Sequence, residues 1–305
     1  MSISSISSHV FLIDAPFQGI RGVLGTYLVK GEQSILIDPG PTVSIPYVEQ
    51  AIKKTCLTNN LSCIIPTHID LDHSGGTWKL MDKYPSSTLL VNPRGVQHMI
   101  EPERLIAGAT ALFGSQVQSY GEIRGTPLDR TYESKDNQEI DLGGVTAKII
   151  WTPGHSSHHQ CIYIPEDHVL IAGDAAGFYY RKTGIIMPTT PPPFNPLKAI
   201  DILNRLIKLS PDIIGYGHFG ATDNAVEKLI AHKEQIKVWL HVVKQNWKPG
   251  SNLKELYEAI READSYAKKS REFNNGTKER SPLINLQGFI QYIEREKAKN
   301  EISSR

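Results

Sequence analysis

The chain has 305 residues, of which 40% are hydrophobic and 21% are charged, and its 33 Lys and Arg against 32 Asp and Glu leave a formal net charge of +1. This length accommodates one large domain or two medium ones with a substantial core, and the composition is typical of a globular protein. The balanced charge gives no sign of a surface for nucleic acid or membrane. We therefore expect no nucleic-acid partner and no membrane partner. A small-molecule substrate and a homodimer are the partners left open.

The N-terminal segment, MSISSISSHVFLIDAPF, lacks a basic start followed by a long apolar run. Elsewhere no stretch approaches the ~18 uninterrupted apolar residues of a membrane-spanning helix. These features favour a cytoplasmic protein. The three cysteines, Cys56, Cys63 and Cys161, are widely spaced and odd in number, which predicts buried, reduced thiols.

Short β-rich runs alternate with helical ones along most of the chain. Apolar runs bounded by turn residues predict strands at 10–14, 26–30, 34–38, 61–67, 87–92, 146–151, 160–164, 168–173 and 212–217. A helix is expected at about 45–54, and a mainly helical, loop-rich insert reaches about 125. After a proline-dense loop at 187–196, Asn195 and Pro196 suit the N-cap and the first position of a helix. This alternation predicts an α/β (α+β) catalytic domain over residues 1–222.

From Asn224 onward the chain changes character, so we expect a helical C-terminal extension over residues 223–305. Asn252 with Glu255 forms a capping pair for a helix, and Ser281 with Pro282 opens another. The polar stretch 267–280 is expected to be an exposed connection. The extension either covers the α/β core or serves as a substrate-side lid or an oligomer contact.

The stretch PTHIDLDHSGG, residues 66–76, places two histidines and two aspartates within six positions. In an extended segment alternate side chains point the same way, so His68, Asp70 and Asp72 can converge on one side. His73 then reaches the same place from the following turn. This spacing differs from the i, i+4 histidine pair of a helical zinc site.

Three further fragments have the same form, an apolar strand that ends in a ligand-type residue beside glycine. They are IIWTPGHSSHH with His155, LIAGDAAG with Asp174 and IIGYGHFG with His218. Glycine lets the backbone turn sharply and approach closely at such a strand end. Four such fragments in one chain predict a metal centre.

As a set, these motifs resemble the metallo-β-lactamase-fold superfamily over roughly residues 8–222. HIDLDH at 68–73 is similar to the motif usually written HxHxDH, and Asp38 in LIDPG is similar to an earlier strand-end aspartate. The TPGH motif followed by histidines and a proline-rich loop looks like the glyoxalase II and lactonase-like hydrolases of the superfamily. The resemblance implies an αββα sandwich with two metal ions at the edge of the sheets, and it does not extend to the C-terminal helices.

The resemblance also implies the ligand sets. One metal ion would take His68, Asp70 and His155, the other would take Asp72, His73 and His218, and Asp174 would bridge them. Asp38 would orient a histidine or the motif loop. His158 and His159 fill no ligand position of the family, so each either orients a ligand or is structural.

Asp70 departs from the family motif, which has histidine at this place. An added carboxylate makes the cluster less positive and shifts the preference from zinc towards iron or manganese. It resembles the HxExDH motif of the flavodiiron branch, although no flavin-binding domain follows residue 222. Alternatively Asp70 faces away from the metal. We expect two divalent metal ions, Zn²⁺ or, because of Asp70, Fe or Mn.

The implied function is a metal-dependent hydrolase that uses a dinuclear centre and a bridging hydroxide to cleave a thioester, a lactone or a related ester or amide bond. Asp72 would be catalytic, orienting the hydroxide and accepting its proton. An alternative is a non-haem iron oxidoreductase, resembling persulfide dioxygenases or a flavodiiron core. A nuclease of the same superfamily and a non-catalytic metal-binding scaffold are further alternatives.

Candidate substrate contacts follow Asp174 in the sequence. Aromatic side chains in GFYYRKTG and TTPPPF would line an apolar pocket: Phe178, Tyr179, Tyr180 and Phe194. Arg181 or Lys182 would hold an anionic end of the substrate. Simple packing of the aromatic side chains under a long loop is the competing interpretation.

Overall fold

The computed structural model describes residues 2–55, 61–218, 220–270 and 282–303, with the side chains of 302 and 303 left aside. The chain divides into two compact units, each described by itself below. Unit 1 comprises residues 1–152, 158–173 and 211–225, and unit 2 comprises residues 153–157, 174–210 and 226–305. The expected domain boundary after residue 222 stays a prediction. Among the described residues no helix is both long and apolar enough to cross a membrane.

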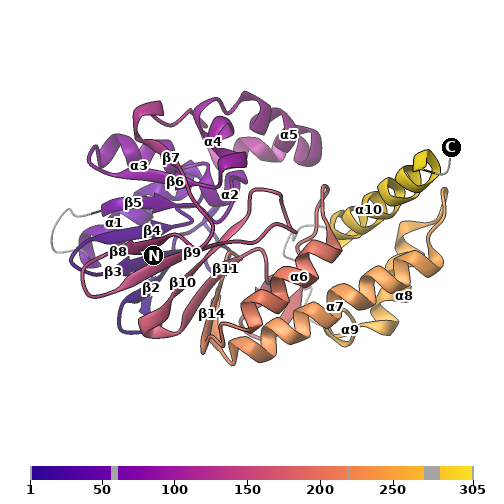
Figure 1. The fold of residues 1–305 in the computed structure, drawn as a ribbon. Helices are drawn as coiled ribbons and strands as arrows, with labels where there is room; N and C mark the ends of the chain where they lie inside the picture. The colour runs from indigo at the N-terminus through magenta and orange to yellow at the C-terminus, as the bar shows by residue number, and fades with distance from the viewer. Residues whose placement is uncertain (1, 56–60, 219, 271–281, 304–305) are drawn as a thin grey trace. The chain divides into compact units, whose positions relative to one another are not determined.

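Unit 1 contains a seven-stranded sheet in the order β1-β2-β3-β4-β5-β6-β7 (Figure 1). Its strands are β1 Ser2–Ser5, β2 Val10–Asp14, β3 Gly25–Lys30, β4 Ser34–Ile37, β5 Leu61–Ile65, β6 Thr88–Val91 and β7 Thr131–Glu133. The first four strands pair antiparallel, and β4 to β7 pair parallel. The carboxyl ends of β4 and β5 therefore lie at the same edge of the sheet, where Asp38 and the 66–76 motif follow them.

A second sheet of unit 1 has six strands in the order β15-β14-β11-β10-β9-β8. Its strands are β8 Glu139–Asp141, β9 Thr146–Trp151, β10 Gln160–Ile164, β11 Val169–Gly173, β14 Ile213–Tyr216 and β15 Gly220–Asp223. Within it only β11 and β14 pair parallel. This pairing places the end of β14, which leads to His218, beside the end of β11.

The core of unit 1 explains why its central strands are apolar throughout. On β4, Ile35 and Ile37 pack between the two sheets, in a cluster that includes Ile149 and Ile171. Leu36, on the other face of the same strand, packs with helical residues. A strand buried on both faces has a continuous apolar run in its sequence, as β4 has at residues 35–37.

Unit 1 also contains α-helices and short 3₁₀ helices. They are α1 Ile45–Thr55, α2 Leu71–Ser74, α3 Thr77–Lys83, α4 Pro93–Ile100 and α5 Glu103–Phe113, with short 3₁₀ helices η1 Thr42–Ser44, η2 Gly114–Tyr120, η3 Leu128–Arg130 and η4 Pro165–Asp167. The apolar side chains of α1, α3 and α4 pack together with the outer face of the sheet. The expected helical insert before residue 125 corresponds to α4, α5 and η2.

Unit 2 is a hairpin with a set of helices. The hairpin strands are β12 Phe178–Tyr180 and β13 Ile185–Met187, and the helices are α6 Pro196–Ile207, α7 Ala225–Asn246, α8 Leu253–Ala263, α9 Ser265–Ser270 and α10 Pro282–Ser303. As expected, the Asn195 side chain caps α6, and the Asn252 side chain caps α8 while also donating to Glu255. The Phe289 ring of α10 packs against Phe194 and against Trp239 of α7.

Some of the elements expected from the sequence differ from those observed. The strands β1, β7, β8, β12, β13 and β15 were not predicted, because at three or four residues they are too short to show an alternating pattern. The expected exposed connection at 267–280 is wrong for its first residues, since α9 reaches Ser270 and Ala267 is buried. Residues 271–280 lie outside the described part of the chain.

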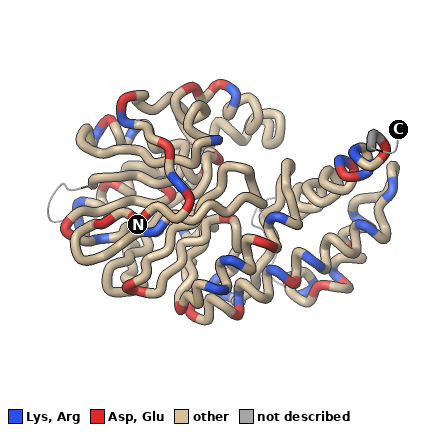
Figure 2. Tube along the Cα trace, viewed as in Figure 1, with Lys and Arg blue, Asp and Glu red and all other residues tan. Residues whose placement is uncertain are grey.

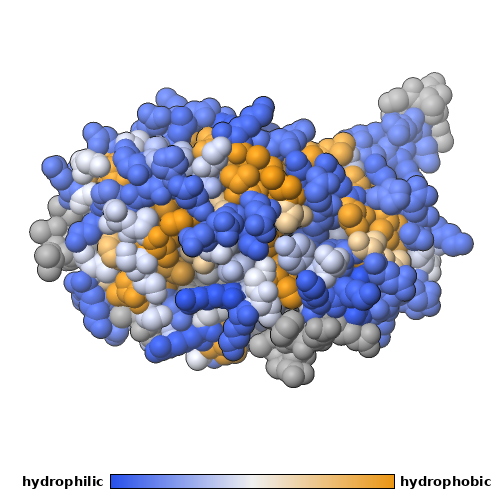
Figure 3. All heavy atoms as spheres, turned by 90° about the horizontal axis from the view of Figure 1, so that it is seen from below, coloured by the Kyte–Doolittle hydropathy of each residue, from blue (hydrophilic) through white to orange (hydrophobic). Residues whose placement is uncertain are grey.

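Charged and apolar residues are mixed on the surface. Figure 2 shows both signs of charge along α7 and α8, where Lys237 pairs with Glu234 and Arg261 pairs with Glu258. On the face drawn in Figure 3, apolar residues form areas separated by hydrophilic ones. The most exposed large apolar side chains, Leu128 of η3 and Ile20, lie far apart in the sequence. Scattered residues of this kind are ordinary and do not by themselves mark a binding surface.

Candidate metal centre

The 66–76 motif leaves strand β5 and enters a short helix. His68 and Asp70 lie in the loop, whereas Asp72 and His73 lie on α2. The expectation that Asp72 shares one extended segment with His68 and Asp70 is therefore wrong. The helix starts here because Asp70 occupies its N-cap position and its carbonyl oxygen accepts from the backbone N–H of His73 and of Ser74 at 2.9 Å each. Gly76 follows because a Cβ there would overlap the Ile45 side chain.

Unit 1 holds one group of metal-ligand type within itself: Asp72, His73 and His218, all buried, with one ligand atom from each within 4.8 Å of the others. Asp72 Oδ2 lies 3.8 Å from His73 Nε2 and 3.7 Å from His218 Nε2. These separations are too long for hydrogen bonds. They are close to the roughly 3.3 Å between neighbouring ligands of a tetrahedral metal ion with bonds of about 2.0 Å.

Asp38 determines the tautomer of two histidines. It follows β4 in a left-handed conformation, with φ 49°, and its Oδ2 accepts from His73 Nδ1 at 3.0 Å and from the Thr67 hydroxyl at 2.8 Å. Since the single proton of this hydroxyl goes to Asp38, Thr67 Oγ1 must accept from His68 Nδ1, 3.0 Å away. His68 and His73 therefore carry their protons on Nδ1 and present Nε2 as a lone-pair donor.

Asp70 faces His68 rather than away from it. Asp70 Oδ2 lies 3.5 Å from His68 Nε2, and 34% of the Asp70 side chain is exposed. Asp70 is not a member of the group of Asp72, His73 and His218. It is thus an additional carboxylate beside His68, in the place where the motif leads one to expect histidine.

Two histidines that fill no expected ligand position pack beside His68. The ring of His159 stacks on the His68 ring with centroids 5.0 Å apart, and that of His158 lies parallel at 6.4 Å. His159 is fully buried, and its Nδ1 contacts the Thr152 hydroxyl at 2.7 Å. His159 lies beside His68 because the N–H of the next residue, Gln160, donates to the Thr67 carbonyl at 2.7 Å, a tertiary contact that sequence spacing does not show.

Cys63 and Cys161 are buried, as expected, and neither forms a disulfide with another described cysteine. Burial raises the pKa of the Cys63 thiol to about 11, so this side chain is a neutral thiol at physiological pH. The prediction for Cys56 lies outside the described residues.

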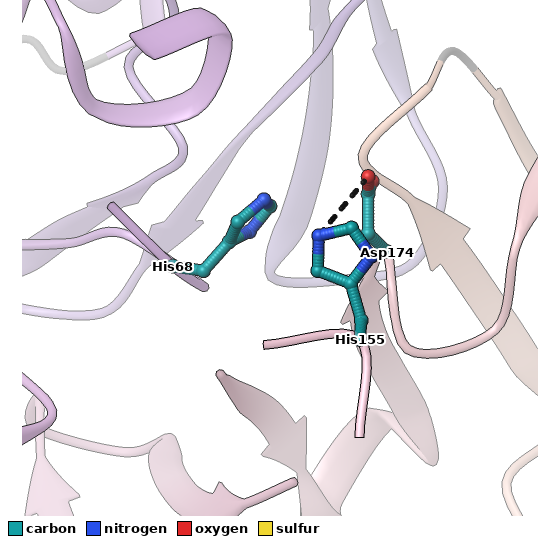
Figure 4. A group of neighbouring side chains, drawn as sticks. All are labelled: His68, His155 and Asp174. Atoms are coloured by element: carbon teal, nitrogen blue, oxygen red, sulfur yellow. Dashed lines mark ion pairs between the residues drawn. The ribbon is translucent and has the colours of Figure 1, made fainter. Parts of the chain in front are cut away.

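His155 and Asp174 belong to unit 2. His155 Nε2 lies 3.9 Å from Asp174 Oδ2, the ion pair drawn as a dashed line in Figure 4, where His68 of unit 1 is also drawn. The Thr189 carbonyl oxygen is 2.7 Å from His155 Nδ1. A carbonyl oxygen can only accept, so His155 also carries its proton on Nδ1 and presents Nε2 as a lone-pair donor. The Thr189 hydroxyl donates to the backbone oxygen of Asp174 at 3.2 Å.

The aromatic residues expected to line a pocket separate into two kinds. The half-buried rings of Phe178 and Tyr180 lie on one face of β12, with centroids 4.7 Å apart. Tyr179 is buried on the other face. Phe194 is 1% exposed and packs against Phe289. Arg181 and Lys182 are exposed in the hairpin turn.

The chemistry of the donor set fits a divalent transition metal. His68, His73 and His155 each have Nδ1 committed to an oxygen acceptor, which is the arrangement that orients a metal-binding imidazole through Nε2. Carboxylates lie opposite these nitrogen atoms in each unit. Mixed imidazole and carboxylate donors suit zinc, iron or manganese better than calcium or magnesium.

A mixed α/β fold with histidines and aspartates of this kind at its strand ends defines a metal-binding class of protein. Residues 21–218 match the family model of the metallo-beta-lactamase superfamily, and the chain belongs to that superfamily. The expected family and fold class are thereby confirmed, including a helical C-terminal extension.

Known relatives agree with this family. A metallo-beta-lactamase fold-containing protein of Sulfurisphaera tokodaii is 29% identical over 222 residues, which are 70% of this chain and 80% of the relative. The hydroxyacylglutathione hydrolase of Prochlorococcus marinus is 28% identical over 188 residues, which are 59% of this chain and only 60% of that enzyme. The crystal structure of an archaeal superfamily protein from Sulfolobus tokodaii has a TM-score of 0.65 at 25% identity and covers 87% of this chain and 98% of that one.

Proposed function

We propose that the chain is a metal-dependent hydrolase of thioesters, lactones or related ester or amide bonds, with two zinc ions as cofactors. His68, Asp70 and His155 would hold one ion, Asp72, His73 and His218 the other, and Asp174 would bridge them. The observation that carries this proposal is the forced tautomer of His68, His73 and His155, each of which has Nδ1 bonded to an oxygen acceptor. Packing alone does not require three histidines to be oriented alike.

When bound, divalent cations supply Lewis acidity at a carbonyl oxygen and lower the pKa of a water molecule. The protein positions the reacting groups around them. Asp72 is buried on α2, where its carboxylate can orient a water molecule and accept its proton. Asp38 keeps His73 in the required tautomer through the hydrogen bond to Nδ1.

Substrate binding would use the outer face of the β12–β13 hairpin. Phe178 and Tyr180 offer two adjacent, half-buried aromatic rings for an apolar acyl group. Arg181 and Lys182, exposed in the adjoining turn, would bind an anionic end of a small molecule. A thioester with a charged thiol portion has both features. Tyr179 and Phe194 are buried and therefore do not belong to this surface.

The test is elemental analysis of full-length protein purified without added metal, followed by hydrolysis assays on thioester and lactone panels. We expect about two zinc ions per chain and metal-dependent turnover that is abolished in Asp72→Ala and in His155→Ala. Asp82→Ala, an exposed aspartate on α3, is the control. Unchanged turnover in both site variants would contradict the proposal.

A non-haem iron oxidoreductase is the second candidate, and Asp70 favours it. This carboxylate lies 3.5 Å from His68 Nε2, where it adds a hard oxygen donor beside imidazole. Iron in the purified protein, together with oxygen or persulfide consumption and no hydrolysis, would support this candidate instead.

A further inference from the structure

The last helix of unit 2 contacts the loop that holds His155. This loop, residues 188–195, joins β13 to α6. The carbonyl oxygen of Thr189 in this loop accepts a hydrogen bond from His155 Nδ1. The Thr189 hydroxyl donates a hydrogen bond to the backbone oxygen of Asp174. Thr189 therefore contacts both His155 and Asp174, so the position of this loop helps to fix the orientation of the His155 ring.

Asn285 of α10 holds the next residue of the loop, Thr190, at two points. Its side-chain Oδ1 accepts from the Thr190 N–H at 2.8 Å, and its backbone oxygen accepts from the Thr190 hydroxyl at 3.0 Å. Asn285 is 95 positions from Thr190 in the sequence, so this is a tertiary contact and not a local turn.

Two other residues of α10 also contact this loop. Gly288 faces the Thr190 carbonyl so closely that a Cβ there would overlap the oxygen. At the far end of the loop, Arg295 Nη2 donates to the Phe194 carbonyl at 2.8 Å. Asn285 and Gly288 both contact Thr190, the residue directly after Thr189, and the Asn285 Oδ1 contact is the one that a side-chain substitution can remove without adding bulk.

We propose that Asn285 is a positioning residue for the metal ligand His155, acting through Thr190 and Thr189. This inference rests on the proposed function, because it needs His155 to bind a metal ion. The C-terminal helix then belongs to the metal-binding apparatus of unit 2. Groups that hydrogen-bond a metal ligand directly, as Thr189 does, contribute about 10–100-fold to metal affinity, and because Asn285 acts through two intervening residues we expect its contribution at the lower end, about 10-fold.

The experiment measures Zn²⁺ and Co²⁺ binding to the full chain, stripped of metal, by competition with a chromophoric chelator. Asn285→Ala removes the Oδ1 acceptor, whereas Asn285→Asp keeps an oxygen in the same place and should restore binding. Gln287→Ala, at an exposed position of the same helix, is the matched control. The visible spectrum of the Co²⁺ protein gives a second readout that depends on ligand geometry and not on turnover.

We expect Asn285→Ala to weaken one binding step about 10-fold and to alter the Co²⁺ spectrum, while the other step stays as in wild type. Equal binding by Asn285→Ala and wild type would overturn the inference, and so would an Asn285→Asp variant as weak as Asn285→Ala. If Asn285→Ala does not fold, Thr190→Val tests the second contact between Asn285 and the loop by removing the hydroxyl that donates to the Asn285 backbone oxygen, and metal binding equal to that of wild type would then overturn the inference. A wild-type chain that binds no metal would instead overturn the proposed function itself, and with it the inference.

Discussion

Asp38 shows how one buried side chain can prepare two histidines for the same task. Its carboxylate accepts from the Thr67 N–H at 2.6 Å, from the Thr67 hydroxyl at 2.8 Å and from His73 Nδ1 at 3.0 Å. Because the Thr67 hydroxyl donates to Asp38, its oxygen can only accept from His68 Nδ1, which fixes the tautomer of His68. A group that can only accept at these positions therefore decides which nitrogen atom of each ring is available to a metal ion.

Asp38→Asn should lower metal affinity about 10–100-fold. The Thr67 N–H, the Thr67 hydroxyl and His73 Nδ1 all donate to Asp38, and the NH₂ group of asparagine would face at least one of these donors with a second donor. The measurement is competition with a chelator on the full chain. Asp82→Asn, at an exposed position of α3, makes the same chemical change outside the candidate centre and should bind as wild type. Equal affinity in the two variants would contradict the orienting role of Asp38.

The sequence reveals the residue types of the candidate centre but not the contacts that orient them. His155, Asp174 and His218 are recognisable because each follows an apolar run and stands beside glycine, whereas His68 and Asp72 are recognisable from the density of ligand-type residues in HIDLDH. The roles of Thr67, Thr189 and His159 depend on tertiary contacts. Thr189, for example, lies 34 positions from His155, and no local pattern links a carbonyl oxygen in a proline-rich loop to a distant ring nitrogen.

At the scale of elements, Gly288 lets helix α10 pack closely against the loop at 188–195. Gly288 lies inside this helix, where alanine would ordinarily be preferred by about 1 kcal/mol. A Cβ at this position would overlap the Thr190 carbonyl oxygen and approach the Phe194 Cβ. Close packing against the loop therefore outweighs helix propensity at this position.

Gly288→Ala should lower the free energy of unfolding by about 1–3 kcal/mol, the usual cost of overpacking. Gly108→Ala is the matched control, since Gly108 also lies inside a helix, α5, and has no atom within 4 Å of an added Cβ. That substitution should leave stability unchanged or raise it by up to about 1 kcal/mol. Urea unfolding of both variants provides the comparison, and equal shifts would contradict the packing argument.

Helix α7 carries a buried histidine, His232, next to Gln235, the residue that bonds the helix to its neighbours. His232 Nδ1 contacts Gln235 Oε1 at 3.3 Å, and Gln235 Nε2 donates to Ile186 of β13 and to Asp264. Desolvation lowers the pKa of His232 from 6.5 to about 4. The unfolded chain takes up a proton as the pH falls below 6.5, while the folded chain does not until about pH 4, so folding stability falls across this window.

His232→Asn should remove about 2 kcal/mol of the stability loss between pH 7 and pH 5, because the proton uptake by the unfolded chain at this residue is then absent. Denaturant unfolding of metal-free protein at the two pH values measures the difference. His241→Asn, at an exposed position of the same helix, is the control. An identical pH dependence in wild type and His232→Asn would contradict the prediction.

Long apolar runs in the sequence predicted most of the main strands and helices. Several strands of three or four residues were not predicted. Strands such as β10 and β11 are buried along their whole length and are easily recognised. The hairpin β12–β13 has three residues in each strand, and its position follows from tertiary contacts such as that between Gln235 and Ile186. The helical tail was recognised by its apolar periodicity and its asparagine caps, but its contact with the Thr189 loop was not, because helix periodicity shows which face is buried and not what covers it.

For the whole molecule, the candidate ligands are spread along the chain from His68 to His218, so the unfolded chain does not hold them together. A metal ion that binds only the folded state stabilises it by about 2.7 kcal/mol per site at a concentration 100-fold above the dissociation constant. We therefore expect Zn²⁺ to raise the melting temperature of metal-stripped protein and a chelator to reverse the rise. Mg²⁺, which prefers oxygen ligands, should have a much smaller effect on a site rich in imidazole. His155→Ala should reduce the Zn²⁺ shift, and a wild-type melting temperature that is the same with Zn²⁺ and with chelator would contradict a metal site in the folded chain.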